Sequence, residues 1–182
     1  MKPILLEMTA FGSYAKKTVV DFERLTHGLY LITGDTGAGK TTIFDAIMFA
    51  LYGVASGPDR KTAMMHCDFV EKSVDTEVTL HFRQGGRTYA VARTIHYPKK
   101  RGTENEYGDG YLDAVMWEPD SDGEPIEGIT NVTNRCTELL GLNAGQFRKI
   151  VMLAQGEFKR FLAADPEEKN AILGQIFDNF AY

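Results

Sequence analysis

The sequence is poor in the features that mark several classes of protein. It has two cysteines in 182 residues, Cys67 and Cys136, and neither has a second Cys or His at metal-ligand spacing. A disulfide framework and a zinc site therefore have no support. No segment approaches the roughly 18–20 consecutive apolar residues of a membrane helix, and the first residues lack the apolar length of a signal peptide. We expect a soluble, cytoplasmic protein with reduced thiols and no membrane partner.

Basic residues are also in deficit, but the deficit is local. The formal net charge is −5, from 25 acidic and 20 basic residues. Residues 102–128 contain nine of the acids and no Lys or Arg, so the rest of the chain has 16 acids against 20 bases. Because the distribution of charge matters more than its sum, the acidic total does not exclude a nucleic-acid partner.

The hydrophobic pattern predicts an α/β protein. Short apolar or β-branched runs bounded by turn residues indicate strands, and a 3.6-residue period indicates helices. The expected strands are Ile4–Thr9, Thr18–Phe22, Leu29–Thr33, Val74–Phe82, Arg87–Tyr97 and Gly110–Trp117. The expected helices are Lys40–Tyr52 with Gly53 as its C-cap, a helix from Thr130 ending at Gly141, Ala144–Leu153, Glu157–Ala163 and a last helix from Asp165. A loop with one short helix is expected over 54–73.

One motif carries chemistry. Residues 34–41 read Gly-Asp-Thr-Gly-Ala-Gly-Lys-Thr, which fits G-x-x-x-x-G-K-[ST], and they lie between a predicted strand and a predicted amphipathic helix. Glycines let consecutive N–H groups face one anion, and the helix dipole adds to them. Lys40 is the expected cation for the β- and γ-phosphates, and the Thr41 hydroxyl is the expected Mg²⁺ ligand. The predicted cofactor-binding residues are Gly34, Asp35, Thr36, Gly37, Ala38, Gly39, Lys40, Thr41 and Thr42, and the predicted cofactors are ATP and Mg²⁺.

A phosphate loop does not by itself separate the nucleotide-using classes. A GTPase is disfavoured because no Asn-Lys-x-Asp follows the loop. A self-contained kinase of a small molecule is a less favoured interpretation, but it stays as an alternative. Such kinases usually begin with the strand that leads into the loop and have an Arg-rich lid, whereas here two strands precede the loop and the bases at 99–101 lie beside an acidic run. A module that binds ATP without hydrolysing it is a third interpretation.

The order of elements and several short motifs resemble a known family. Phe-Gly-Ser at 11–13, the run Gly28–Thr42, Ala-Leu-Tyr-Gly at 50–53 and Leu-Ala-Gln-Gly-Glu-Phe at 153–158 look like the N-terminal half of SbcC, the SMC-like, ABC-type ATPase subunit of the bacterial SbcCD nuclease. The resemblance runs from Met1 to Tyr182. It implies a P-loop NTPase of the ABC/SMC head type, with a mixed β-sheet, an antiparallel β-subdomain and a helical segment.

The resemblance also assigns roles and partners. It implies that Gln155 contacts Mg²⁺ and the attacking water, so Lys40 and Gln155 are the expected catalytic residues and Thr41 and Gln155 the expected metal ligands. The catalytic carboxylates and the signature of such an ATPase do not follow the loop here. We therefore expect a fragment that binds ATP weakly and hydrolyses little, completed by a C-terminal half of the same protein. Further expected partners are a second head, the nuclease subunit SbcD and double-stranded DNA ends, in DNA repair and recombination.

The expected organisation is one N-terminal lobe over 1–182. Residues 1–56 hold the first strands, the phosphate loop and the first helix, and 57–128 form a β-meander. Residues 129–164 are a helical segment with Gln155, and 165–182 begin an exit helix towards a coiled coil.

Overall fold

The computed structural model describes residues 1–25, 31–56, 62–103, 106–150 and 165, in a chain that divides into two compact units. The first unit is Met1–Gly141 and the second is Leu142–Tyr182. This boundary falls inside the predicted helical segment 129–164, between its first two helices. Among the described residues, no helix is long and apolar enough to cross a membrane.

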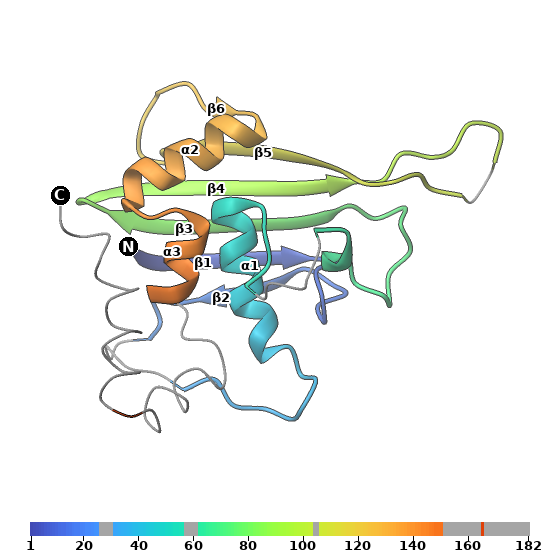
Figure 1. The fold of residues 1–182 in the computed structure, drawn as a ribbon, viewed down its shortest axis with the longest axis horizontal. Coiled ribbons are helices and arrows are strands. Elements are labelled where there is room, and N and C mark those ends of the chain that lie inside the picture. The colour runs from blue at the N-terminus through green and yellow to red at the C-terminus, as the bar shows by residue number, and fades with distance from the viewer. Residues whose placement is uncertain (26–30, 57–61, 104–105, 151–164, 166–182) are drawn as a thin grey trace. The chain divides into compact units, whose positions relative to one another are not determined.

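Six strands of the first unit form one sheet in the order β2-β1-β3-β4-β5-β6, and every pairing is antiparallel. Figure 1 shows the long strands side by side. The strands are β1 (Lys2–Thr9), β2 (Thr18–Asp21), β3 (Thr76–Gln84), β4 (Arg87–His96), β5 (Tyr111–Trp117) and β6 (Ile126–Glu127). The predicted meander over 57–128 thus continues the sheet that β1 and β2 begin, and the short β6 is a strand that the sequence pattern did not predict.

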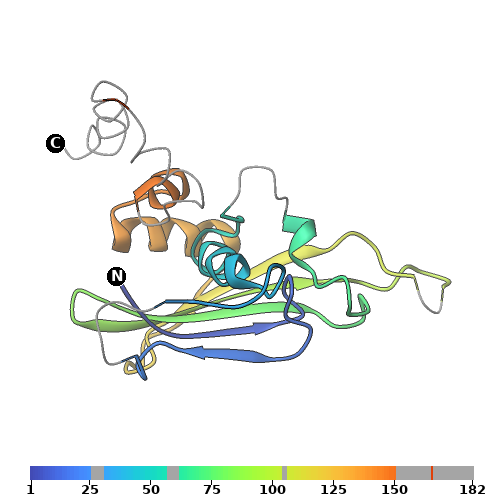
Figure 2. The same cartoon turned by 90° about the horizontal axis from the view of Figure 1, so that it is seen from below.

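The strand register builds one apolar face. Leu6 on β1 pairs with Leu80 on β3, Leu80 with Val91 on β4, and Val91 with Met116 on β5, and all four are buried. Because side chains alternate along a strand, this row and its i±2 neighbours share one face of the sheet. Helices α1 (Lys40–Tyr52) and α2 (Ile129–Leu140) pack on that face, as Figure 2 shows. Each large apolar side chain buried between the layers contributes about 1.5–3 kcal/mol.

Helix α1 has the predicted bounds and ends at the predicted cap. Gly53 has φ 72°, and its N–H donates to the carbonyl of Phe49 at 2.8 Å. This is the left-handed C-terminal geometry that glycine adopts without strain. The apolar residues that recur at helical spacing along α1 are buried, and so are others outside that stripe. The stripe is Ile43, Ala46, Ile47, Ala50 and Leu51, and the others are Met48, Phe49 and Tyr52. The helix is therefore enclosed over most of its circumference, more than a two-layer pattern predicts.

The predicted strand Leu29–Thr33 is not formed in its described part. Leu31–Thr33 have no regular structure, and Leu31 is 84% exposed. A strand requires backbone hydrogen bonds to a neighbouring strand. None of the six described strands pairs with these residues, so the apolar run alone was not sufficient for a strand.

The helices after the sheet follow the prediction as far as the structure describes them. Helix α2 ends at Gly141, which has φ 67° and donates to Thr137 O at 2.8 Å. In the second unit, α3 covers Ala144–Ile150, and residues 151–153 of the predicted helix lie outside the described residues. The predicted helix Glu157–Ala163 and the last predicted helix lie outside them too, apart from the exposed Asp165. In the predicted loop 54–73, the 3₁₀ helix η1 covers Thr62–Met65.

A buried arginine joins the C-terminal end of α1 to the sheet and to α2. Arg93 on β4 is fully buried, and its Nε donates to Ala50 O at 2.8 Å. Its Nη2 donates to Leu51 O at 3.1 Å and to Thr133 Oγ1 at 2.8 Å. Burial lowers the pKa of Arg93 to about 10, so the side chain is a cation at neutral pH. A cation at this end of a helix also complements the negative pole of the dipole.

We predict that Arg93→Ala destabilises the protein by about 3 kcal/mol, because it leaves buried carbonyl groups of α1 without donors and creates a cavity. Urea unfolding measures the loss. The matched control on the same strand is Arg87→Ala, whose side chain is 70% exposed and lies 3.8 Å from Glu118 in an ion pair. Such surface pairs contribute about 0–1 kcal/mol, and equal losses in the two variants would contradict the prediction.

Both cysteines are buried with no exposed surface. Burial raises the pKa of Cys136 to about 11, so its thiol is protonated at neutral pH, and the thiolate is the reactive form. We predict that Cys67 and Cys136 react with a thiol reagent such as DTNB only after denaturation. A Ser73→Cys variant, at an exposed position, supplies the control and should react at once. Rapid labelling of either native thiol would contradict the fold.

Candidate phosphate-binding site

The predicted phosphate loop leads directly into the N-terminus of α1. Gly39 is the N-cap, with φ 87°, and no side chain caps the helix there. The first-turn N–H groups of a helix have no intrahelical acceptor, and together with the dipole they attract an anion. Gly37 also has φ 87°, a conformation that L side chains rarely adopt. The loop thus ends in uncapped amide donors of the kind that bind phosphate.

Lys40 spans the loop. Its Nζ donates to Gly34 O at 2.7 Å and to Asp35 O at 2.6 Å. Ala38 N donates to Asp35 O at 3.2 Å, which closes a turn inside the loop. The ammonium group therefore lies beside the loop backbone and brings a positive charge to the same place as the helix dipole. A phosphate would compete for it against neutral carbonyls, and a charged acceptor makes the stronger hydrogen bond.

The turn after β1 packs against this loop and the first turn of α1. The Tyr14 hydroxyl donates to Gly39 O at 3.2 Å. A Cβ placed on Gly39 would lie 3.1 Å from the Tyr14 ring and 3.2 Å from Ser13 Cβ. A Cβ placed on Gly12 would lie 2.6 Å from Cγ2 of Thr42. The absence of a side chain at Gly12 and Gly39 therefore lets the turn pack closely on the end of the loop and the first turn of α1.

The hydroxyls that follow Lys40 differ in their surroundings. Thr41 is exposed, whereas Thr42 is buried against the turn at Gly12. Asp45 is also buried, and its Oδ1 accepts hydrogen bonds from the Ser56 amide at 3.0 Å and from the Ser56 hydroxyl. Thr41 thus carries an accessible hydroxyl on the first turn. Mg²⁺ in phosphate sites takes one or two protein oxygens and completes its shell with phosphate and water, so one hydroxyl fits it.

The predicted site residues are brought together in part. Gly34–Thr42 form the loop and the start of α1, and Gln155 lies outside the described residues. Lys17, just before β2, is exposed and pairs with Glu7 at 3.1 Å. Sequence reasoning did not single out Tyr14. A tyrosine just after a Gly-Ser turn carries no motif, so its contact with Gly39, 25 residues away, needed the fold.

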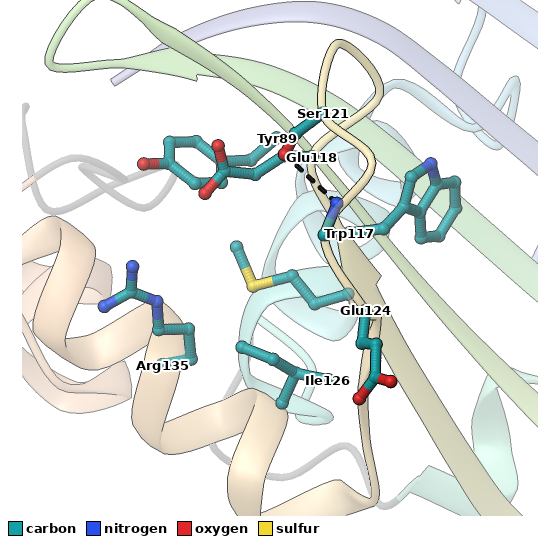
Figure 3. A pocket seen from close by; sticks show the side chains of 9 residues that line it. Tyr89, Trp117, Glu118, Ser121, Glu124, Ile126 and Arg135 are labelled. Carbon is teal, nitrogen blue, oxygen red and sulfur yellow. Dashed lines mark hydrogen bonds between the residues drawn. The ribbon is translucent and has the colours of Figure 1, made fainter.

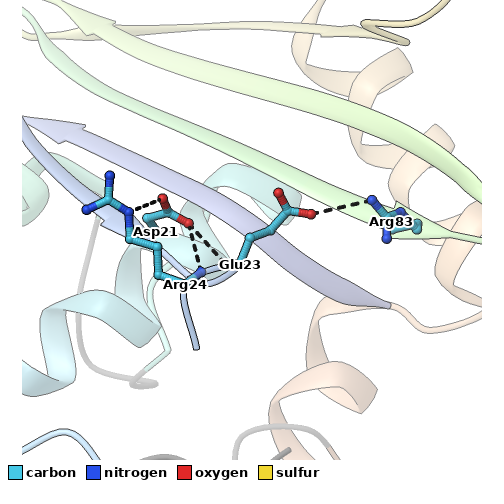
Figure 4. Close-up of polar contacts among 4 residues, drawn as sticks. All are labelled: Asp21, Glu23, Arg24 and Arg83. Carbon is cyan, nitrogen blue, oxygen red and sulfur yellow. Dashed lines mark hydrogen bonds and ion pairs between the residues drawn. The ribbon is translucent and has the colours of Figure 1, made fainter. Parts of the chain in front are cut away.

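Residues 19–23, at the end of β2, are apolar residues interspersed with the acidic Asp21 and Glu23, a pattern that resembles a metal-binding strand. Asp21 Oδ1 accepts hydrogen bonds from the amides of Glu23 (3.0 Å) and Arg24 (3.3 Å), and its Oδ2 pairs with Arg24 Nε at 3.0 Å. Glu23 contacts Arg83 on β3 at 3.5 Å (Figure 4). These carboxylates close a turn and pair with neighbouring arginines. Among the described residues, no group of three or more His, Cys, Asp or Glu could hold a metal ion.

A pocket occurs at the other end of the strands from the turn after β1. It lies between α2 and the segment after β5, with Met116, Ile126 and Tyr89 among its lining side chains (Figure 3). Glu118 and Glu124 also line it, with Arg135 on α2. Two carboxylates disfavour an anionic ligand, so the pocket does not compete with the glycine-rich loop as a phosphate site.

Comparison with known families decides the class. The profile of a family described as "AAA domain" matches residues 5–181. The chain belongs to this family. AAA domains are P-loop NTPases, so the predicted α/β fold class is confirmed, and membership implies a nucleotide as ligand.

Curated relatives of this AAA-domain chain are named as the SbcC subunit of the nuclease SbcCD. The chain is similar to that protein of Lactococcus lactis, at 38% identity over 194 residues, and to that of Vibrio cholerae, at 38% over 190 residues. Each match covers 100% of this chain and 18% of the relative, so the chain spans about a fifth of their length. Among solved structures, the SMC head domain from Thermotoga maritima matches with a TM-score of 0.38 at 22% identity, over 74% of this chain and 42% of that chain. The resemblance to SbcC inferred from the motifs is thus confirmed by similarity to the curated relatives along the whole chain.

The close approach at Gly12 predicts a position-specific cost. Gly12 (φ 53°) and Gly85 in the β3–β4 turn (φ 57°) both have left-handed backbones, but a Cβ at Gly85 would meet nothing within 4 Å. We predict that Gly85→Ala costs about 1 kcal/mol from backbone strain. Gly12→Ala should cost at least about 1 kcal/mol more, because its methyl group overlaps Thr42. Urea unfolding compares the two, and equal costs would contradict the described packing.

Proposed function

We propose that this chain is the ATP-binding N-terminal lobe of an SMC-like ATPase of the SbcC type. The observation that carries the proposal is the glycine-rich loop that ends in an uncapped helix N-terminus, with Lys40 Nζ on the loop carbonyls. The AAA-domain match and the similarity to SbcC over the full chain support it. A small-molecule kinase, the alternative left by the sequence, has no comparable support.

The residues of the loop divide the task of holding MgATP. The backbone amides of 34–42 bind the phosphate oxygens, and Lys40 leaves its carbonyl acceptors for the β- and γ-phosphates. Thr41 supplies a protein oxygen to Mg²⁺, which neutralises phosphate charge when bound. Gln155, by its resemblance to the family, orients the attacking water and contacts the metal. The turn at Gly12–Tyr14 packs against the end of the loop and the first turn of α1.

A C-terminal half of the same protein completes the active site in this proposal. Leu31 beside the loop is 84% exposed and Phe44 on α1 is 44% exposed, so apolar surface adjoins the phosphate loop. A packed neighbour would remove that surface from water. The curated relatives are about five times as long as this chain, which leaves room for such a half.

The partners belong to the whole protein and are proposed for it. The relatives' name, which makes them part of the SbcCD nuclease, supports a nuclease subunit, SbcD, as partner. We further propose a second copy of the head, which engages on ATP binding and controls nuclease action on double-stranded DNA ends during repair. The cytoplasm is the proposed location.

The test is the removal of the cation. In the full-length protein that carries this chain, Lys40→Ala should weaken MgATP binding by about tenfold or more, because a hydrogen bond to a charged group contributes about 1.5–3 kcal/mol. Hydrolysis should fall with it. Titration with a fluorescent ATP analogue and a phosphate-release assay measure the two.

Lys2→Ala is the matched control, since Lys2 is exposed at the start of β1, at the opposite end of that strand from the turn. It should bind and hydrolyse ATP as the wild type does. Undiminished ATP affinity in Lys40→Ala would sink the proposed site, and phosphate transfer to a metabolite in place of hydrolysis would favour the kinase.

A further inference from the structure

The turn that follows β1 is held rigidly before it reaches the phosphate loop. Phe11 and Tyr14 exchange backbone hydrogen bonds at 3.0 and 2.9 Å. Gly12 N donates to Met65 O at 2.7 Å, which ties the turn to η1. The Phe11 ring is fully buried, with its centroid 5.4 Å from that of Phe49 on α1. The backbone of this turn is therefore fixed in position, and so is the Cα of any side chain that extends from it towards the loop.

From this turn, Tyr14 donates a hydrogen bond to one backbone carbonyl. Its hydroxyl lies 3.2 Å from the oxygen of Gly39, the N-cap of α1. Partial burial raises the pKa of Tyr14 above its usual value, so the hydroxyl stays protonated at neutral pH and can donate this hydrogen bond. The N-cap carbonyl also accepts the first intrahelical bond, from the amide of Ile43. The Gly39 carbonyl thus has two donors, the Tyr14 hydroxyl and the helix amide of Ile43.

The planar peptide group links the direction of the Gly39 carbonyl to the direction of the Lys40 N–H. In a trans peptide the C=O of one residue and the N–H of the next point in opposite directions within one plane. A Gly39 carbonyl held towards α1 therefore directs the Lys40 N–H the other way, towards the loop. Gly39 cannot fix this plane by itself, because glycine has the widest choice of backbone conformations.

We propose that Tyr14 is a positioning residue of the nucleotide site: its hydroxyl orients the Gly39–Lys40 peptide so that the Lys40 N–H faces the phosphates. The inference rests on the proposed function and extends it to a residue outside the phosphate-loop motif. It also gives a reason for Gly39, since any side chain there would displace the Tyr14 ring, which lies 3.1 Å from the position of a Cβ.

The simplest competing account is that the Tyr14 ring only fills space beneath the loop. Tyr14→Phe separates the two, because it keeps the ring and removes the hydroxyl. An amide that binds phosphate in both the ground state and the transition state contributes uniform binding, so its misalignment raises KM and leaves kcat unchanged. A variant that is merely less stable loses active protein, which lowers the apparent kcat at constant KM.

The experiment uses the full-length protein with MgATP. Tyr14→Phe should raise KM for ATP about threefold to tenfold at unchanged kcat, the range expected for one neutral hydrogen bond. Tyr111→Phe, at a 58% exposed residue at the start of β5, should match the wild type. Without nucleotide, amide hydrogen exchange at Ile43 should be several-fold faster in Tyr14→Phe, because the acceptor carbonyl is no longer held.

Each outcome decides one question. A wild-type KM together with unchanged exchange at Ile43 overturns the role of Tyr14. A lower kcat at constant KM, with a lower unfolding midpoint, also overturns it in favour of packing alone. A wild-type protein that neither binds nor hydrolyses MgATP overturns the proposed function, and exchange at Ile43 still tests the hold on Gly39 separately.

Discussion

The structure depends on fixing both ends of one buried helix. Helix α1 is enclosed along most of its length, so its terminal polar groups need partners or a purpose. At the C-terminal end, Arg93 donates to the carbonyls of Ala50 and Leu51, and Gly53 closes the last turn. At the N-terminal end, no side chain caps the amides, and Tyr14 from the turn after β1 donates to the carbonyl of the N-cap. The uncapped amides remain available for an anion.

This asymmetry links the fold to the proposed chemistry. The strands and their connections supply the side chains that bond both ends of α1, since Arg93 lies on β4 and Tyr14 on the turn after β1. A helix whose negative pole is neutralised by a buried cation and whose positive pole is open is suited to hold phosphate without moving. Lys40 adds a positive charge on a flexible side chain, whose ammonium group is bound by neutral loop carbonyls. In the proposed function, binding of MgATP requires only that the Lys40 side chain exchange its hydrogen-bond partners, while the backbone of α1 stays in place.

The sequence was sufficient for the features that local chemistry determines. The bounds of α1 and its glycine cap follow from periodicity and turn residues, because those signals lie within a few positions of one another. The phosphate-loop motif was recognised from residues equally close together, and its role in binding phosphate is a proposal. The cap at Gly141 followed too.

Features that depend on distant segments were missed. Arg93 reads as one more polar position in an alternating strand, and only its burial against α1 and Thr133 reveals its task. Tyr14 acts across 25 residues and belongs to no motif. Leu31–Thr33 carried a strand pattern without a described neighbour to pair with, so propensity gave the wrong answer there. The role of Gln155 rests on family resemblance and remains a proposal.

The most direct test of the account is a crystal structure of the protein with Mg²⁺ and a non-hydrolysable ATP analogue. We predict that the β- and γ-phosphates lie on the amides of 34–42, with Lys40 Nζ moved from the carbonyls of Gly34 and Asp35 to phosphate oxygens. We also predict the metal on the Thr41 hydroxyl and the Tyr14 hydroxyl still on Gly39 O. A nucleotide bound elsewhere, with Lys40 still on the loop carbonyls, would contradict it.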